Sequence, residues 1–312
     1  MSAPYVSVVV PVYNEVESLP ELRQQIIAAC EAAGYSFEVW LVDDGSKDGS
    51  WDLISVMNAE DPRFRGVRFK RNYGKSAALA IGFSRVNGRY VVTMDADLQD
   101  DPSEIPALIG MLENGLDLVS GWKKVRHDPI TKTAPSKFFN YTTRVVSGIP
   151  LHDFNCGLKA YRHDVVKSVR VYGELHRYIP LLAKWEGYDR IGEKVVNHRA
   201  RKYGKTKFGL ERALRGFLDL VSVSFLTRFA ARPMHFFGGV GFLFFFIGFL
   251  IGAWLSVAKL AFNHPIGDRP LLFLAMLLML LGAQLFMTGL LGEMLIKPNI
   301  EGTDHYQVQD EV

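Results

Sequence analysis

The chain has 312 residues, of which 48% are hydrophobic and 22% charged, a composition that excludes a disordered or low-complexity protein. Its net charge of +3 is too small to indicate a nucleic-acid-binding protein. The charge is uneven, because only three basic but six acidic residues follow His235, so a basic, water-soluble portion precedes a portion of another kind.

The start of the chain does not have the features of a secretion signal. Residues 1–5 lack a basic stretch, and the apolar run that follows is interrupted at Pro11. Two cysteines, Cys30 and Cys156, are too few for a disulfide framework or a four-thiolate zinc site. We therefore expect the first portion to fold in the reducing cytoplasm.

Short apolar runs rich in valine alternate with helical patterns over the first 120 residues. The predicted strands are Tyr5–Val10, Phe37–Val42, Val67–Phe69, Tyr90–Met94 and Leu116–Ser120. The predicted helices are Leu19–Ala33, Trp51–Ala59, Ser76–Val86 and Glu104–Asn114. This alternation predicts an α/β fold, with a mostly parallel sheet covered by helices on both faces. Ligands of such sheets bind beyond the carboxyl ends of the strands.

Acidic residues gather at three of these strand ends. The segments are Pro11–Glu15, Asp43–Ser46 and Asp95–Asp101. Carboxylates crowded at a strand end repel one another, so a cationic partner is expected. Taken alone, Asp43–Ser46 is equally typical of a simple turn.

The Asp95-Ala96-Asp97 sequence is the clearest candidate for a metal site. In an extended chain, alternate side chains point to the same side, so both carboxylates would face one ligand. Gln99 has the same parity and would add a carbonyl oxygen. Oxygen ligands suit a hard divalent cation that shares its coordination with substrate phosphates.

Two uncharged segments near the C-terminus are each long enough to cross a membrane. Phe236–Ala258 has 23 residues and Leu271–Gly292 has 22, whereas about 20 helical residues span the hydrocarbon core. Both are apolar on all sides, whereas a buried core helix keeps a polar stripe. We predict two membrane-spanning helices.

Basic residues around these segments predict their orientation. Arg212, Arg215, Arg228 and Arg232 precede the first segment, and Lys297 follows the second. The connection at 259–270 holds only two basic residues, so the N-terminal portion and the C-terminus are expected on the cytoplasmic side. Residues 210–226 have helical apolar spacing among Arg and Lys, which is typical of an interfacial helix or of a helix packed on the soluble domain.

Taken in order, these segments resemble the family 2 glycosyltransferases with the GT-A fold. Asp153–Arg162 resembles the Asp-Phe-x-Cys-Gly segment of dolichyl-phosphate mannose synthases and of bacterial polyprenyl-phosphate glycosyltransferases. Arg201–Lys207 resembles their Arg-x-x-Gly-x-Ser-Lys segment, with Thr206 in place of the usual serine. The bacterial enzymes also end in two membrane helices, so the resemblance covers nearly the whole chain.

The resemblance implies a division of the chain into four parts. They are a cytoplasmic catalytic domain at 1–208, juxtamembrane amphipathic helices at 209–234, a two-helix transmembrane domain at 235–297 and a cytoplasmic tail at 298–312. It implies an inverting transferase that moves a sugar from a GDP-mannose or UDP-glucose type of nucleotide sugar to a polyprenyl phosphate. The reaction is expected at the cytoplasmic face of the inner membrane.

Roles for individual residues follow from the same resemblance. The residues implied for the nucleotide sugar are Pro11, Tyr13, Glu15, Val42, Asp44, Lys75, Asp95, Ala96, Asp97 and Gln99. Asp95, Asp97 and Gln99 would hold Mg²⁺ or Mn²⁺. Lys75 would reach a phosphate or the base, although a solvated lysine at the start of a helix fits its position nearly as well.

The acceptor phosphate would be bound by Arg126, Arg201, Lys205 and Lys207. Another interpretation of the 199–207 stretch is a basic patch attracted to anionic lipid. Asp153 is expected beside the acceptor, where it either orients the phosphate or acts as a base, and the sequence leaves both open. Asp97, Asp153 and Arg201 are the predicted catalytic residues.

Two other functions fit parts of the pattern. A processive polysaccharide synthase shares the first motifs and the membrane helices, but its expected Gln-x-x-Arg-Trp segment does not occur in the sequence. A catalytically inactive membrane scaffold would not need Asp97, Gln99 and Arg201, all of which are present. The glycine-rich stretch at 238–241 would allow close helix contact in lipid, so a homo-oligomer is a further hypothesis.

Overall fold

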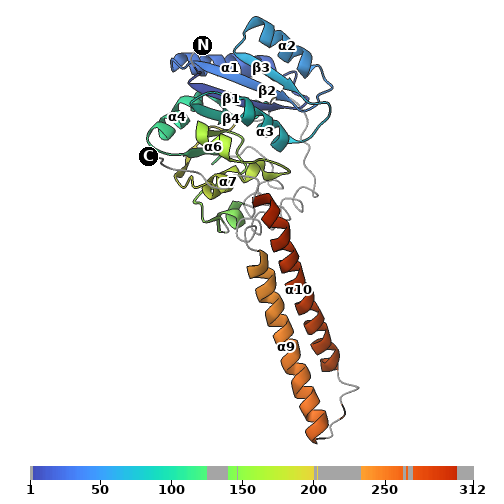
Figure 1. Ribbon diagram of the computed structural model, residues 1–312. Helices are drawn as coiled ribbons and strands as arrows, with labels where there is room; N and C mark the ends of the chain where they lie inside the picture. Colours follow the sequence, from blue (N-terminus) through green and yellow to red (C-terminus); the bar gives the residue numbers. More distant parts are fainter. Residues whose placement is uncertain are drawn as a thin grey trace. The chain divides into compact units, whose positions relative to one another are not determined.

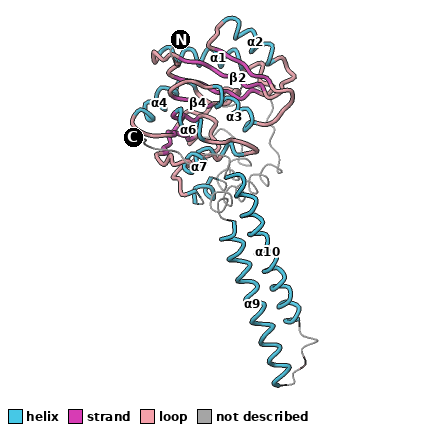
Figure 2. Tube along the Cα trace, viewed as in Figure 1, coloured by secondary structure: helices cyan, strands magenta, loops and turns pink. Residues whose placement is uncertain are grey.

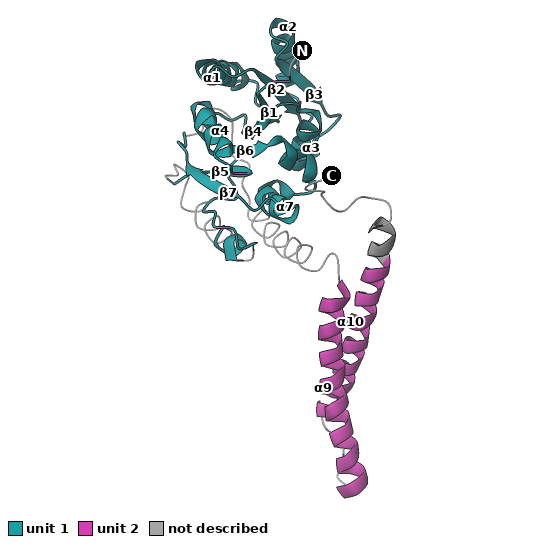
Figure 3. Ribbon diagram, turned by 60° about the vertical axis from the view of Figure 1, so that its left-hand side comes forward, with its two compact units in different colours: residues 1–223 teal, residues 224–312 magenta. Residues whose placement is uncertain are grey.

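A computed structural model describes residues 3–124, 140–145, 147–199, 202, 233–262, 265 and 270–300, with side chains up to Met294. The chain divides into two compact units, residues 1–223 and 224–312, which are coloured separately in Figure 3. Most of the predicted juxtamembrane segment at 209–234 and of the tail at 298–312 lies outside the described residues. The predicted four-part division therefore stays a prediction.

The described part of the first unit is built around a seven-stranded sheet. The strands are β1 (Val6–Val12), β2 (Phe37–Asp43), β3 (Phe64–Arg68), β4 (Tyr90–Thr93), β5 (Leu118–Trp122), β6 (Lys159–Arg162) and β7 (Ile191–Val195). Their order across the sheet is β3-β2-β1-β4-β6-β5-β7, and all pairs are parallel except the two that involve β6. The predicted mostly parallel α/β sheet is confirmed.

Helices cover both faces of this sheet, as Figures 1 and 2 show. They are α1 (Leu19–Ala32), α2 (Ser50–Glu60), α3 (Lys75–Arg85), α4 (Ile105–Glu113), α6 (His163–Ser168) and α7 (Ile179–Trp185), with short 3₁₀ turns η1 (Pro102–Glu104) and η2 (Leu175–Arg177). Val8 and Val10 of β1 belong to the core with α1 and α4, whereas Val9 belongs to the core with α3, α6 and α7. This alternation is the period of two expected of a strand buried on both faces.

The strand order reverses between β1 and β4. The chain first builds β1, β2 and β3 outward in one direction and then returns to place β4 on the other side of β1. In sheets of this kind, ligands bind at the carboxyl ends of the strands that flank such a reversal. The loops that follow Val12 and Thr93 therefore enclose the expected ligand position.

The second unit contains two long apolar helices, α9 (Pro233–Phe262) and α10 (Pro270–Ile300). Each contains an 18-residue stretch with a mean hydropathy of 2.3, and Pro233–Phe262 and Pro270–Met294 are long and apolar enough to cross a membrane. Glycines let the two backbones approach closely, since a Cβ on Gly241 would lie 2.6 Å from the carbonyl oxygen of Gly282. The predicted close helix contact at Gly241 is thus made within one chain, and a homo-oligomer stays a prediction.

Candidate active site

The turn after β2 is tight, and its geometry explains the residues at 43–46. The Asp43 carboxylate accepts the backbone N–H of Ser46 at 2.9 Å, and Gly45 has a φ of +74°. A Cβ at Gly45 would lie 2.6 Å from the carbonyl carbon of Arg71, so only glycine fits against this neighbouring backbone. The simple-turn interpretation of this segment is correct for its backbone.

Asp44 also connects this turn to the loop before α3. One carboxylate oxygen accepts the N–H of Tyr73 at 2.6 Å and the other accepts the N–H of Gly74 at 2.9 Å. Burial raises the pKa of Asp44, although these two hydrogen bonds act in the opposite direction. Its carboxylate thereby holds the two residues that precede α3, and its contact with a nucleotide stays a prediction.

The loop after β1 is tied to the loop after β2. The backbone N–H of Asn14 donates to the Ser46 hydroxyl at 2.9 Å, and the side-chain oxygen Oδ1 of Asn14 accepts the N–H of Lys47 at 2.9 Å. Asn14 has a φ of 55°, a conformation that asparagine tolerates better than most residues. The half-buried Tyr13 and Glu15 therefore belong to a loop that is fixed against the loop containing Asp44.

The Asp95–Gln99 loop follows β4, and its backbone is not extended. The strand ends at Thr93 and residues 96–97 form a turn, so the alternation argument for two carboxylates on one side was wrong. Instead, the Asp97 carboxylate accepts the N–H of Gln99 at 3.2 Å. Leu98 has a φ of 60°, which is a strained conformation for a bulky side chain and is often found at active sites.

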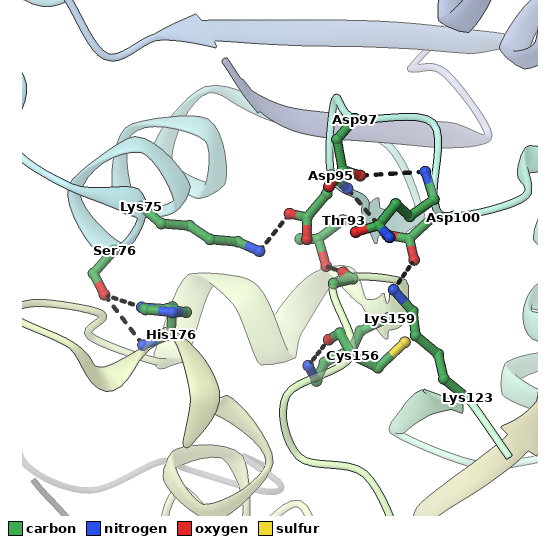
Figure 4. A network of polar contacts seen from close by, with 12 residues as sticks. Lys75, Ser76, Thr93, Asp95, Asp97, Asp100, Lys123, Cys156, Lys159 and His176 are labelled. Carbon is green, nitrogen blue, oxygen red and sulfur yellow. Dashed lines mark hydrogen bonds and ion pairs between the residues drawn. The ribbon is translucent and has the colours of Figure 1, made fainter. Parts of the chain in front are cut away.

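Asp95 and Asp97 have different surroundings. Asp95 forms an ion pair with Lys75, which begins α3 (Figure 4). Partial burial acts to raise the pKa of Asp95, but Lys75 and then Lys123 outweigh it and lower the pKa to about 2. Lys75 is therefore not a solvated lysine. Its ammonium is the cationic partner that was expected for the crowded carboxylates at this strand end.

The described residues contain no group of three or more His, Cys, Asp and Glu side chains that could hold a metal ion alone. A cation bound here would need other ligands. Asp97 is 7% exposed and Gln99 is half-buried, so together they offer a carboxylate and an amide oxygen at one loop. This donor set fits a hard cation that completes its coordination with the phosphates of a substrate.

The Asp153–Lys159 segment lies directly against this loop. A Cβ on Gly157 would be 2.5 Å from a carboxylate oxygen of Asp95, and the Gly157 carbonyl accepts the hydroxyl of Thr93 at 2.9 Å. Asp153 is 1% exposed, and its carboxylate accepts the N–H of Asn155 at 3.1 Å. The predicted acceptor segment and the predicted metal loop are therefore in direct contact.

Two lysines of this site could not be identified from the sequence: Lys159, which is buried, and Lys123, whose side chain is 12% exposed. Lys159 is 4% exposed and donates to the carbonyl oxygens of Phe154, at 3.2 Å, and of Cys156. Burial lowers its pKa. Lys123 forms an ion pair with Asp100, and although burial acts against its charge, the neighbouring anions raise its pKa overall. Lys159 is the first residue of β6 and Lys123 directly follows β5, so the available signal was a lysine at a strand end.

A small cavity lies beside Asp95, between α3, η2 and the Asp153–Lys159 segment. Its polar lining includes Lys75, Thr93, Lys159, His176 and Arg177, and it has about 10 Å³ of space for the centre of a water molecule. Burial, followed by the nearby Lys75, lowers the pKa of His176 well below its usual value, so this imidazole is neutral. Its Nδ1 lies 3.0 Å from the hydroxyl of Ser76.

His198 and Arg199, which precede the predicted basic motif, lie alongside the Asp95–Gln99 loop. The N–H of Arg199 donates to the carbonyl oxygen of Gln99 at 3.1 Å, and its guanidinium bonds Asp101 at 2.6 Å. The backbones of His198 and Asp100 pair in an isolated antiparallel β-bridge. The predicted phosphate ligands Arg126, Arg201, Lys205 and Lys207 lie outside the described residues. Their roles stay predictions.

Of the other predicted nucleotide-site residues, Pro11 and Val42 face each other in the register of β1 and β2. Ala96 is 4% exposed in the loop after β4. The structure thus brings the described candidates to the carboxyl ends of β1, β2 and β4.

Comparison with known proteins identifies the family. The profile of "Glycosyl transferase family 2" matches residues 7–170. The chain is 39% identical to "Dodecaprenyl-phosphate galacturonate synthase" of Rhizobium johnstonii over 93% of this chain and 87% of that one. It is 37% identical to "Undecaprenyl-phosphate 4-deoxy-4-formamido-L-arabinose transferase" of Pseudomonas syringae over 93% and 85%.

A solved structure agrees with this at the level of the fold. Glucosyl-3-phosphoglycerate synthase from Mycobacterium tuberculosis, in complex with Mn²⁺ and UDP-glucose, superposes with a TM-score of 0.53. It is 21% identical, and the similarity covers 72% of this chain and 79% of that one. This confirms the predicted GT-A-like sheet. The family match over residues 7–170 and the two relatives show that the chain is a glycosyltransferase and belongs to glycosyl transferase family 2.

Proposed function

We propose that the protein transfers a sugar from a nucleotide sugar to a polyprenyl phosphate at the cytoplasmic face of the inner membrane. The observation that carries the proposal is the close approach of Gly157 to Asp95, because it brings the segment that we assign to the acceptor against the loop that we assign to the donor. The names of both relatives include a polyprenyl phosphate and a sugar, which supports this acceptor class. A lipid acceptor also explains why two long apolar helices accompany the catalytic unit.

Asp97 and Gln99 are the residues that we propose to hold Mg²⁺ or Mn²⁺, together with pyrophosphate oxygens of the donor. The Mn²⁺ in the complex of glucosyl-3-phosphoglycerate synthase supports a divalent cation for this fold. Such an ion would stabilise the charge that develops on the departing nucleoside diphosphate. Lys75 holds Asp95 at the same loop and provides a further positive charge beside the pyrophosphate.

The acceptor needs positive charge more than it needs a base. A phosphate monoester has a second pKa of about 6, so its oxygens are already ionised near neutral pH. We propose that Arg201, Lys205 and Lys207, with Arg126, neutralise this anion as it approaches the donor. An arginine guanidinium suits phosphate because it binds two oxygens at once. Direct displacement at the anomeric carbon inverts its configuration, so an α-linked donor gives a β-linked lipid product.

A transfer assay tests the proposed function. Membranes that contain the protein are incubated with polyprenyl phosphate and labelled GDP-mannose, UDP-glucose or UDP-galacturonate, and the lipids are extracted. We expect one donor to give label in the lipid fraction, dependent on added polyprenyl phosphate. Membranes without the protein are the control. Label in a water-soluble polymer would instead favour a processive polysaccharide synthase, and no label with a broad donor panel would favour an inactive scaffold.

The membrane topology gives a second prediction. A cysteine introduced at Asn263, between the two apolar helices, should react with an impermeant thiol reagent from the periplasmic side, and one at Asp304 should not. Cys30 and Cys156 are both buried, so the unmodified protein gives a low background. Labelling of both introduced cysteines from the same side would contradict two membrane crossings.

A further inference from the structure

Lys123 and Asp100 form a largely buried ion pair next to the Asp95–Gln99 loop. The ammonium of Lys123, at the end of β5, lies 2.8 Å from a carboxylate oxygen of Asp100. The side chain of Lys123 is 12% exposed and that of Asp100 is 0% exposed. A charge removed from water in this way requires a close partner. Each member of the pair therefore determines where the other can lie.

Asp100 connects the ion pair with Lys123 to the Asp95–Gln99 loop. Its second carboxylate oxygen accepts the backbone N–H of Asp95 at 3.1 Å (Figure 4). One oxygen of Asp100 thus pairs with the Lys123 ammonium, and the other accepts a hydrogen bond from Asp95, the first residue of the loop. On the opposite side, a Cβ at Gly157 would lie 2.9 Å from the same Asp100 oxygen. The carboxylate has little room to move.

The loop needs such external support. Its ligand-bearing residues, Asp97 and Gln99, flank Leu98, whose φ of 60° is unfavourable for a bulky side chain. A strained backbone persists only where its surroundings hold it. Asp100 is the next residue after Gln99, so its fixed position restrains both ends of the loop, through the chain at one end and through the Asp95 N–H at the other.

We propose that Lys123 is a positioning residue that fixes the Asp95–Gln99 loop through Asp100 and thereby sets the affinity of the site for its divalent cation. The proposal rests on the assignment of Asp97 and Gln99 as metal ligands. It does not depend on the identity of the acceptor or of the sugar. Groups that do not bind the metal but fix the position of its ligands typically contribute about 10–100-fold to metal affinity.

The experiment measures Mn²⁺ binding without turnover. Full-length protein in detergent micelles is titrated with Mn²⁺, alone and with UDP, by calorimetry and by the electron paramagnetic resonance signal of free Mn²⁺. We expect Lys123→Met to weaken Mn²⁺ binding about 10–100-fold. Lys123→Arg keeps the charge and should recover most of the affinity.

Arg190→Met is the matched control. Arg190 lies 2.8 Å from Asp117, just before the opposite end of β5, so this substitution breaks another ion pair at the same strand. We expect it to leave Mn²⁺ binding unchanged. If both variants weakened Mn²⁺ binding equally, the effect would be general destabilisation and the proposal would be wrong.

The double variant Lys123→Met/Asp100→Asn covers the case in which Lys123→Met does not fold, because it leaves no unpaired buried charge. It too should bind Mn²⁺ more weakly than the unmodified protein. Unchanged Mn²⁺ affinity in either folded variant overturns the proposal. So does a raised KM for polyprenyl phosphate at unchanged Mn²⁺ affinity, which would place Lys123 at the acceptor. The Mn²⁺ titration contains no acceptor. Its result therefore tests the role of Lys123 even if the transfer assay shows no activity with polyprenyl phosphate.

Discussion

Asp97→Asn is expected to lower the transfer rate about 10³-fold while the protein stays folded. Loss of the charge that holds a catalytic cation costs several kcal/mol of transition-state stabilisation, and about 4 kcal/mol corresponds to three orders of magnitude in rate. Folding should persist because the Asp97 carboxylate accepts the N–H of Gln99, and an asparagine oxygen can accept the same bond. The initial rate with saturating donor and acceptor measures the effect, and the melting temperature checks folding.

Asp101→Asn is the matched control for this substitution. Asp101 is also a buried carboxylate near the loop, but its oxygens already accept from Ser103 and from the Arg199 guanidinium. We expect a loss of about tenfold or less, because Asp101 is not a proposed metal ligand and an asparagine oxygen can still accept the bond from Ser103. EDTA should abolish the activity of the unmodified enzyme, and added Mg²⁺ or Mn²⁺ should restore it. Full activity in EDTA would remove the metal from the mechanism.

The elements with strong periodicity could be predicted from the sequence. β1, β2 and β4 are buried on both faces, and their valine-rich runs place them within about two residues of the observed bounds. β3 begins at Phe64 rather than at the predicted Val67. Arg65 and Arg68 at this edge of the sheet interrupt the apolar pattern, because an edge strand carries charged residues where a central strand does not.

The second half of the sheet could not be predicted. β6 has four residues and begins with the buried Lys159, and β7 contains Glu193 and Lys194. Neither has the composition of a strand, and neither alternates regularly. Their positions depend on pairing with β4 and β5, which is a tertiary effect that no local pattern records.

The candidate site shows the same limit. The segments could be identified from acidic residues at strand ends and from the resemblance to a family. Side-chain partners could not, because they join residues distant in sequence, such as Lys75 with Asp95 and Lys123 with Asp100. The extended geometry assumed for residues 95–97 was wrong because the sequence does not show where β4 ends.

The acceptor site gives the other large expected effect. Arg201→Ala should lower kcat/KM for polyprenyl phosphate about 10–100-fold and leave binding of the nucleotide sugar unchanged. One charge-assisted hydrogen bond contributes about 1.5–3 kcal/mol, which is one to two orders of magnitude in rate. Lys202→Ala is the matched control, because the adjacent Lys202 is exposed and its ammonium lies 2.7 Å from Glu21 of α1. Loss of nucleotide binding in Arg201→Ala would contradict the assignment of this motif to the lipid phosphate.

Substitution of Asp153 distinguishes a role in orienting the acceptor phosphate from a role as a catalytic base. Its carboxylate accepts the N–H of Asn155, a bond that asparagine can keep, so Asp153→Asn removes the charge without removing the turn. Because the phosphate is already ionised above its second pKa of about 6, we expect a loss of about 10–100-fold with an unchanged pH profile. Asp153→Ala removes the turn bond as well and should lose more. If the acidic limb of the pH–rate profile disappears in Asp153→Asn, the carboxylate is a base and the orienting role is refuted.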